Sequence, residues 1–234
     1  MPIFWVVDGQ TYLDLIVPAV RGTTSILNSA LKHGSTLKRV VLTSSAVAAL
    51  EVTTVPRVFT ESSWNEAAVE AVKTKASAAG PFMIYCASKT LAEKAAWEFV
   101  AAHSSEISWD LAAINPSLII GVRLSTSFLY CWPDLHSYPW QPSLAPAPTI
   151  DDINTSQREV YDTLTGALAG ARLQSQSNWV HVAVTAEAHV RATHTAAAGG
   201  QRIILNSGHF FYQDFREYHN PLLSFVTEPD ECVT

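Results

Sequence analysis

Short apolar runs alternate with longer amphipathic stretches along most of this chain, and this alternation restricts the possible folds more than any other feature. Ile3–Val7, Lys38–Thr43 and Trp109–Ile114 have the length and apolar character of strands that are buried on both faces of a parallel sheet. Leu13–Leu31 and Tyr85–Ala102 carry apolar residues at helical spacing. Strands that alternate with such helices predict an α/β fold in which helices cross over a parallel sheet.

The second half of the chain continues the alternation less regularly. We expect further strands at Leu118–Gly121, Trp179–Val182 and Arg202–Leu205. We expect further helices at Ser156–Ala171 and Glu187–Ala198. Together the elements predict a three-layer, Rossmann-like parallel sheet that is reduced in its N-terminal part. We expect residues 1–121 to form a partial core with the catalytic motif, and residues 122–234 to form a smaller substrate-side portion with the remaining core elements.

Five prolines lie between Trp132 and Thr149, together with several aromatic side chains. No helix or central strand tolerates this density of proline, because proline lacks the backbone N–H that both structures use. The stretch is therefore expected to be either a lid over a substrate cleft or an ordinary surface loop.

The composition excludes several classes of partner. The chain has 234 residues, 48% of them hydrophobic, and a net charge of −6 with its lysines and arginines scattered singly, so we expect neither nucleic acid nor an anionic membrane surface as a partner. It has no apolar run of about 18 residues and no signal-peptide pattern, and we expect a cytoplasmic protein. The three cysteines form no CxxC pair and the histidines lack suitably spaced acidic partners, so we expect no metal site.

Tyr85 and Lys89 give the sharpest chemical signal in the sequence. We expect them at the head of a helix, where a four-residue step places both side chains on the same face, while Glu93 and Lys94 face water. A nearby ammonium favours the phenolate, so we expect Lys89 to lower the pKa of Tyr85 and make the phenol a usable proton donor near neutral pH. Taken alone, the pair is a weak signal, because the same spacing also arises by chance on a solvated helix face.

Ser44 and Ser45 directly follow the expected strand Lys38–Thr43. Ligands of parallel sheets bind at the carboxyl ends of the strands, so a hydroxyl at this position would meet a bound substrate. Ser45 would then donate a hydrogen bond to a carbonyl oxygen, which Tyr85 would protonate. Two serines after a strand also form ordinary turns and helix caps, and that alternative stays open from the residues alone.

Several segments of the chain resemble successive motifs of the extended short-chain dehydrogenases/reductases. The branch that they resemble most is that of the fungal NADPH-dependent aldehyde and ketone reductases related to dihydroflavonol reductase. The resemblance covers about residues 12 to 216, with the motifs in the family's order. The segments are Pro18–Thr23, Arg39–Ala46, Tyr85–Glu93, Asn115–Gly121, Ile153–Ser156, Trp179–Val182 with Ala188–Val190, and Tyr212–Phe215.

The resemblance implies a chemistry and a catalytic trio. The reaction would be the reduction of a small-molecule aldehyde or ketone by hydride transfer from NADPH. Ser45 would orient the carbonyl oxygen, Tyr85 would act as the general acid, and Lys89 would tune Tyr85 and bind the nicotinamide ribose. Ser45 is preferred to Ser44 because the family's serine directly precedes a small residue, which here is Ala46.

The cofactor contacts that the family uses are only partly represented in these 234 residues. The nicotinamide half of NADPH would contact Tyr85, Lys89 and the backbone of Pro116, Ser117 and Leu118. The Gly-x-x-Gly-x-x-Gly turn that takes the pyrophosphate, and the strand that reads the adenine ribose, are not found in the sequence. We therefore expect weak NADPH binding or none. A dehydrogenase-fold protein without redox activity, such as a cofactor-independent isomerase or cyclase or an inactive binding relative, remains the alternative.

The apolar run Ile3–Val7 carries an expectation about assembly. It resembles the family's fourth strand, whose neighbour in the sheet is the first strand, and that neighbour is not found in the sequence. A strand with unpaired backbone groups invites pairing with another chain. We therefore expect a homo-oligomer formed through this edge, or poor solubility.

Overall fold

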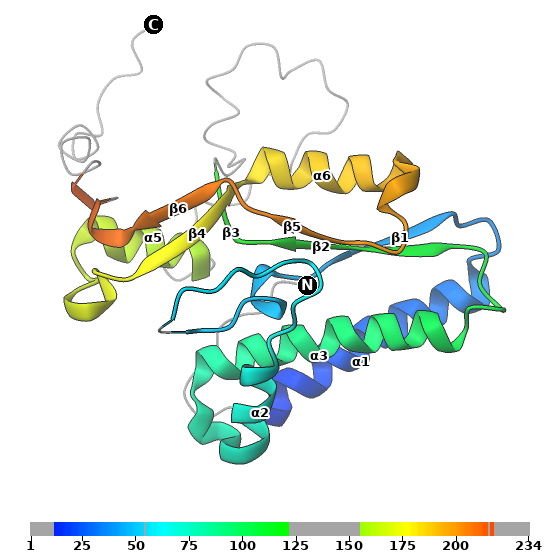
Figure 1. Cartoon of the computed structure of the whole chain (residues 1–234), viewed down its shortest axis with the longest axis horizontal. Helices are drawn as coiled ribbons and strands as arrows, with labels where there is room; N and C mark the ends of the chain where they lie inside the picture. Colours follow the sequence, from blue (N-terminus) through cyan, green and yellow to red (C-terminus); the bar gives the residue numbers. More distant parts are fainter. Residues whose placement is uncertain (1–11, 54, 122–154, 215, 218–234) are drawn as a thin grey trace, which may run out of the picture. The chain divides into compact units, whose positions relative to one another are not determined.

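The computed structural model describes residues 12–53, 55–121, 155–214 and 216–217 of the chain (Figure 1). The described residues fall into two compact units. The first unit takes its described residues from 12–117 and 183–207, and the second takes them from 118–182 and 208–217. The expected strand at residues 3–7, its role in self-association, and the proline-rich stretch lie outside the described residues and stay predictions.

The first unit contains most of the regular structure. Its elements in chain order are α1 (Tyr12–His33), β1 (Arg39–Thr43), the 3₁₀ turn η1 (Ala46–Ala48), α2 (Glu66–Lys75), η2 (Ala76–Ala79), α3 (Pro81–Ala102), β2 (Asp110–Pro116), α6 (Val182–His194), η6 (Ala196–Ala198) and β5 (Arg202–Leu205). Those of the second unit are β3 (Leu118–Ile120), α5 (Thr155–Thr165), η5 (Gly170–Arg172), β4 (Gln176–His181) and β6 (Gly208–Phe211).

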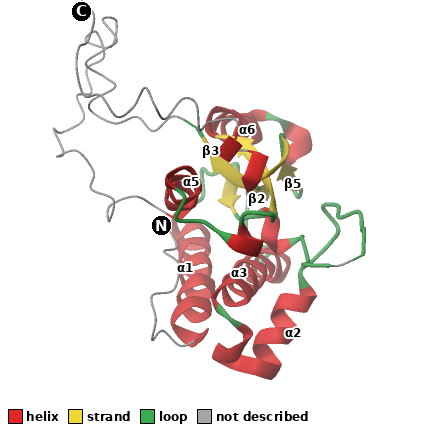
Figure 2. Cartoon of the chain, turned by 90° about the vertical axis from the view of Figure 1, so that its left-hand side faces the viewer, coloured by secondary structure: helices red, strands yellow, loops and turns green. Residues whose placement is uncertain are grey.

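The sheet of the first unit is parallel, in the order β1–β2–β5. Its register pairs Arg39 with Asp110 at one end and Thr43 with Ile114 at the other. Helices α1 and α3 lie side by side under one face, and α6 covers the opposite face (Figures 1 and 2). The predicted three-layer α/β arrangement is confirmed.

The core of the first unit follows the two-residue alternation of the strands. Leu111 of β2 packs with Leu27 of α1 and Ala96 of α3, whereas the next residue, Ala112, packs with Ala192 of α6 on the other face. Successive side chains of a strand point to opposite faces, so both faces of a central strand must be apolar when helices cover both. This is why the strand appears in the sequence as a continuous apolar run.

Helix α3 begins at Pro81, four residues before the start that the sequence suggested. Gly80 adopts φ 88°, a left-handed conformation that glycine tolerates, and Pro81 takes the first helical position. The fixed φ of proline suits this position, and its missing N–H would have had no helical acceptor there. Tyr85 therefore lies in the second turn of the helix and not at its head.

Strand β2 continues to Pro116, two residues beyond the end expected at Ile114. The amide of Ser117 donates to the Leu205 carbonyl at 3.0 Å, so this position faces β5. The backbone groups of successive strand residues point to opposite neighbours, so the backbone nitrogen of Pro116 faces β1. The pairing of β1 with β2 has already ended there, at Thr43 and Ile114. A proline is tolerated in a strand where no ladder N–H is needed.

The sheet of the second unit was only partly predicted. Strand β4 pairs in parallel with β3 and antiparallel with β6, and β6 had no counterpart among the expected elements. Helix α5 ends at Thr165, six residues before the expected end at Ala171. Gly166 follows with φ 84°, the left-handed conformation that commonly terminates a helix. The helix expected at residues 187–198 also lies earlier, because α6 already begins at Val182.

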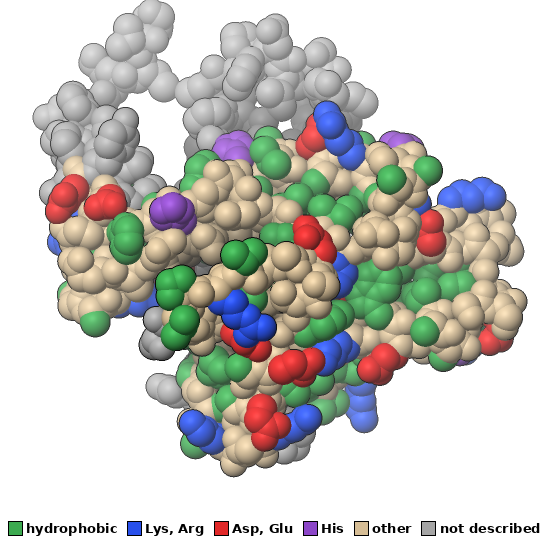
Figure 3. All heavy atoms as spheres, viewed as in Figure 1, with side chains coloured by type: hydrophobic (Ala, Val, Ile, Leu, Met, Phe, Trp, Pro, Cys, Tyr) green, Lys and Arg blue, Asp and Glu red, His purple; other side chains and the backbone are tan. Residues whose placement is uncertain are grey.

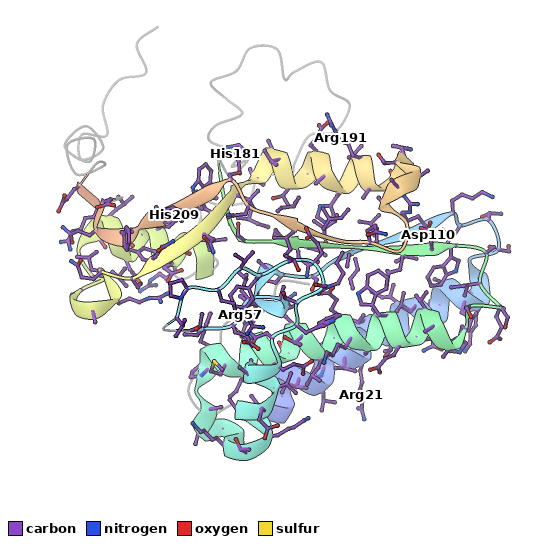
Figure 4. All side chains as sticks on the ribbon, viewed as in Figure 1. Arg21, Arg57, Asp110, His181, Arg191 and His209 are labelled. Atoms are coloured by element: carbon purple, nitrogen blue, oxygen red, sulfur yellow. The ribbon has the colours of Figure 1, made fainter. Side chains whose placement is uncertain are left out.

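Arg39 ties β1 to its neighbour strand and to α6. Its guanidinium forms a bidentate ion pair with Asp110 of β2, which Figure 4 labels. It also donates to the Ala192 and Thr195 carbonyls at 2.6 Å each. A cation at a helix C-terminus satisfies carbonyls that have no helical donor. No helix within the described part of the chain is long and apolar enough to span a membrane.

Candidate functional site

Ser45 and Tyr85 meet at the carboxyl end of β1. Strand β1 leads into Ser44 and Ser45, and the extended backbone of Ser45 (φ −157°, ψ 150°) caps η1, with its Oγ accepting from the Val47 amide at 3.4 Å. A side-chain hydrogen bond joins Ser45 to the hydroxyl of Tyr85 on α3. Both readings of the serine pair therefore apply, because Ser45 is a cap and also touches the expected general acid.

The pKa of Tyr85 differs in direction from the expectation. Burial raises it above the ordinary value of 10.0, the hydrogen bond from Ser45 lowers it less, and the expected lowering by Lys89 is not among its causes. The free energy needed to remove a phenolate from water is larger than the stabilisation that one hydroxyl donor gives it. Tyr85 therefore stays a neutral phenol, with its proton in place, across the neutral pH range.

Lys89 lies one helical turn beyond Tyr85 on the same face of α3. Burial lowers the pKa of its ammonium, and the electrostatic effect of Glu93, a further turn along the helix, opposes this. A partly buried ammonium beside a phenol is a suitable group for holding hydroxyls of a ligand. The structure thus brings together the three residues that the sequence singled out for catalysis.

The predicted nicotinamide-facing segment lies where β2 ends. Pro116 is the buried last residue of β2, and the Ser117 hydroxyl donates to Oδ1 of Asn206 at 3.3 Å. Leu118 begins β3 and belongs to the second unit. Pro116 and Ser117 are therefore at the carboxyl end of a strand next to β1, the same end of the sheet as Ser45.

Glu93 is the main site residue that sequence reasoning placed wrongly. Its side chain was expected to face water, but it is fully buried. Its Oε2 accepts from Ser44 Oγ at 2.6 Å and from Asn115 Nδ2 at 2.7 Å, and its Oε1 accepts from Arg202 Nε at 2.6 Å and Trp97 Nε1 at 3.3 Å. The signal that was available is the four-residue spacing of Tyr85, Lys89 and Glu93, which puts all three on one helical face.

Arg202 of β5 neutralises Glu93 and is itself firmly held. Its guanidinium carbon lies 3.6 Å from the ring centroid of Trp64. It also donates to the backbone carbonyls of Glu61 and Ser63 in the segment between η1 and α2. A buried charge pair persists only when further hydrogen bonds satisfy both partners, and this pair meets that condition.

Asn115 links Glu93 to the catalytic turn. Its Nδ2 donates to the Glu93 carboxylate and, at 3.1 Å, to the backbone carbonyl of Ser45. Its Oδ1 is buried and has no hydrogen-bond partner among the described residues. An unsatisfied buried acceptor is costly, so the end of β2 offers a place for a donor group of a ligand or water.

A histidine occupies the same end of the sheet on the other face. His189 of α6 contacts Thr43 Oγ1 through Nε2 at 2.8 Å, and its Nδ1 donates to the Thr185 carbonyl at 2.7 Å. The carbonyl can only accept, so Nδ1 carries a proton, and the Thr43 hydroxyl faces the other ring nitrogen. Among the residues that the structure describes, no group of three or more His, Cys, Asp or Glu side chains could hold a metal ion.

Cys86 is buried directly beside the trio, and we predict that it is chemically inert in the folded chain. Burial raises the pKa of its thiol from 9.0 to about 12, so at pH 8 its thiolate fraction is about a thousandfold smaller than that of a free thiol. Alkylation by iodoacetamide, followed by peptide mass mapping, is expected to be at least about a thousandfold slower in buffer than in guanidinium chloride. Comparable rates in the two solvents would contradict the burial of this thiol.

Charged side chains are mixed on the face of the molecule that Figure 3 shows, with lysines and arginines lying among aspartates and glutamates. Ion pairs among the described residues include those of Lys94 with Glu66 and Arg57 with Glu51. The charge of this face is therefore mixed and not gathered into one basic or acidic patch.

The chain is similar in sequence and structure to known oxidoreductases. No protein-family model matches the chain. An uncharacterized oxidoreductase of Saccharomyces cerevisiae is 32% identical over 211 residues, which cover 88% of this chain and 54% of that protein. The NADPH-dependent methylglyoxal reductase GRE2 of the same yeast is 29% identical over 211 residues, with the same coverage of 88% and 54%. The crystal structure of Gre2 from Candida albicans in complex with NADPH matches with a TM-score of 0.75 at 27% identity, covering 94% of this chain and 59% of that one.

The chain spans about half the length of the curated relatives that it matches. Within that half, the matches run over most of the chain. In the structure Ser45, at the end of β1, meets Tyr85 of α3, and Lys89 follows Tyr85 by one helical turn. Fold, sequence identity and the order of the motifs agree. The chain belongs to the extended short-chain dehydrogenases/reductases.

Proposed function

We propose that the chain carries the catalytic part of an NADPH-dependent reductase of small aldehydes or ketones. The observation that carries the proposal is the hydrogen bond between Ser45 and Tyr85 at the carboxyl end of β1, with Lys89 one turn further along the same face of α3. The yeast relative GRE2 is an NADPH-dependent methylglyoxal reductase, and this supports the same assignment.

In the proposed reaction, each of the three side chains has a separate task. Ser45 donates a hydrogen bond to the carbonyl oxygen of the substrate and so orients it. Tyr85, a neutral phenol whose pKa is raised by burial, gives its proton to the same oxygen as negative charge develops there. Lys89 stabilises the tyrosinate that remains. NADPH, when bound, supplies the hydride that the carbonyl carbon takes up, so that the product is an alcohol.

The described residues fit one half of the cofactor. The Lys89 ammonium and the Tyr85 hydroxyl offer hydrogen-bond donors for ribose hydroxyls. The unpartnered Oδ1 of Asn115, beside Pro116, offers a buried acceptor that suits an N–H donor such as the nicotinamide carboxamide. No glycine-rich phosphate-binding turn is found in the sequence, so the pyrophosphate lacks its usual site at a helix N-terminus.

We predict that the 234-residue chain binds NADPH with a dissociation constant in the high micromolar range or weaker. Charge-assisted hydrogen bonds contribute about 1.5–3 kcal/mol each, and the absence of two of them weakens binding by at least roughly a hundredfold. Titration of the purified chain by calorimetry or NADPH fluorescence measures this directly. Lys89→Met should abolish the remaining binding, while Lys38→Met should leave it unchanged. A low-micromolar constant would mean that other residues of this chain hold the phosphates.

The proposed activity is tested by following NADPH oxidation at millimolar cofactor with methylglyoxal as the carbonyl probe. We expect measurable turnover that is lost in a chain lacking the Tyr85 hydroxyl. A chain that binds NADPH without oxidising it in the presence of any small aldehyde or ketone would favour the alternative, a dehydrogenase-fold protein without redox activity.

A further inference from the structure

We propose that Glu93 is a positioning residue, whose buried carboxylate fixes the Ser44–Ser45 turn and the end of β2 against α3 and so holds the Ser45 and Tyr85 hydroxyls in register. The inference rests on the proposed function, since it assigns a task toward the same trio. Glu93 touches none of the reacting groups itself. It acts through the two residues that it binds, Ser44 and Asn115.

Two separate hydrogen-bonded routes lead from Glu93 to Ser45. In the first, Oε2 accepts from the Ser44 hydroxyl at 2.6 Å, and Ser44 is the residue next to Ser45 in the chain. In the second, the same oxygen accepts from Asn115 Nδ2 at 2.7 Å, and this amide also donates to the Ser45 carbonyl at 3.1 Å. The turn that carries the Ser45 hydroxyl is thus held at two consecutive residues.

The carboxylate that holds the turn cannot itself move freely. Its Oε1 accepts hydrogen bonds from Arg202 Nε at 2.6 Å and from Trp97 Nε1 at 3.3 Å, and the Arg202 guanidinium stacks on the ring of Trp64. Both oxygens of the Glu93 carboxylate therefore accept two hydrogen bonds, and a buried group satisfied in this way rigidifies its surroundings. Glu93 and Tyr85 share one face of one helix, so this fixed point is rigidly connected to the general acid.

Glu93 also acts on Lys89 through space. Burial lowers the pKa of the Lys89 ammonium, and the negative charge of Glu93 raises it again. Arg202 is the cation paired with Glu93, and it limits this effect. If Glu93 only stabilised the fold, its replacement would affect the surroundings of the Tyr85 hydroxyl no more than the loss of another ion pair does. If Glu93 positions the site, its replacement alters these surroundings and the loss of another ion pair does not.

The test compares Glu93→Gln, Glu93→Asp and a matched control in the full chain. The Gln side chain has the size of Glu93, but it places an NH₂ group against the groups that donate to the carboxylate. The Asp side chain keeps the negative charge. The control is Asp110→Asn, which weakens the Arg39 ion pair at the other end of β1 and β2, roughly 20 Å along the strands from Ser45. The readouts are kcat and KM for methylglyoxal reduction, and the NMR signal of Tyr85 labelled with carbon-13 at Cζ, assigned by its loss in Tyr85→Phe.

We expect Glu93→Gln to lower kcat about 10- to 100-fold with KM changed by less than about threefold, because misplacement of reacting groups by a fraction of an ångström acts on the chemical step. Glu93→Asp should recover most of the loss. The Tyr85 signal should shift in Glu93→Gln and stay in place in Asp110→Asn. Equal effects of Glu93→Gln and Asp110→Asn on kcat, or an unmoved Tyr85 signal in Glu93→Gln, would overturn the proposal.

A milder variant covers the case in which Glu93→Gln fails to fold. Ser44→Ala removes one donor to Glu93 and frees one of the two routes to Ser45, so the Tyr85 signal should shift and kcat should fall about 3- to 10-fold. An unshifted signal in Ser44→Ala counts against the positioning role. The NMR readout needs no turnover, so an inactive wild-type chain would refute the proposed function while leaving the role of Glu93 to be decided by the Tyr85 signal.

Discussion

Replacement of Tyr85 by Phe is expected to reduce the turnover of carbonyl reduction by at least about a hundredfold. The ring and its packing remain, but the proton donor hydrogen-bonded to Ser45 is lost. The carbonyl oxygen then has no general acid as negative charge develops on it. The measurement is kcat at millimolar NADPH, and the loss should appear in kcat and not in KM, because the missing contact matters mainly in the transition state.

Tyr212→Phe is the matched control for Tyr85→Phe. Tyr212 is also a buried tyrosine whose pKa is raised by burial, with a side-chain hydrogen bond to Ser177 that lowers it less, but it belongs to the second unit. Its replacement should leave turnover within about twofold. If Tyr85→Phe keeps turnover within the same range as Tyr212→Phe, Tyr85 has no part in the proton transfer.

Replacement of Arg202 by Met is expected to lower the free energy of unfolding by about 3–5 kcal/mol. The reason is that Glu93, whose side chain is fully buried, would be left without its counter-ion. The carbonyls of Glu61 and Ser63 would also lose their donor, and Trp64 would lose the cation stacked on its ring. The free energy of unfolding of a typical domain is only about 5–15 kcal/mol, so we expect a large shift of the midpoint of urea unfolding.

Arg57→Met provides the comparison for an exposed pair. Arg57, labelled in Figure 4 in the segment between η1 and α2, forms an ion pair with Glu51 and is 55% exposed. Exposed ion pairs contribute about 0–1 kcal/mol, so this variant should stay close to the wild type. The double variant Glu93→Gln with Arg202→Met should be more stable than Arg202→Met alone, because the uncompensated charge is gone. A cost for Arg202→Met as small as that for Arg57→Met would show that the pair is not needed for stability.

The sequence by itself determined the alternation of strands and helices in the first unit and the helical face that Tyr85 and Lys89 share. Apolar runs such as Trp109–Ile114 mark strands because covering both faces of a central strand requires uninterrupted apolar residues. The four-residue spacing of Tyr85 and Lys89 fixes a shared helical face whatever surrounds the helix. These features depend on local periodicity, and tertiary contacts do not change them.

The ends of the elements were harder to predict, since they depend on single residues in specific conformations. Gly80 and Gly166 end or begin helices through left-handed backbone, and Pro116 stays in β2 because its neighbour strand has already ended. Strand β6 is short, and its pairing with β4 gives it an extended form that its own residues do not demand.

Only the tertiary structure decided what surrounds the trio. A helix shows in its sequence which residues share a face, but not what covers that face. Glu93 looked like a solvated residue until Ser44, Asn115 and Arg202, which come from three distant segments, were seen to enclose its carboxylate. The direction of the Tyr85 pKa shift was decided in the same way, because desolvation depends on every atom packed around the phenol and outweighs the single neighbour that the sequence made visible.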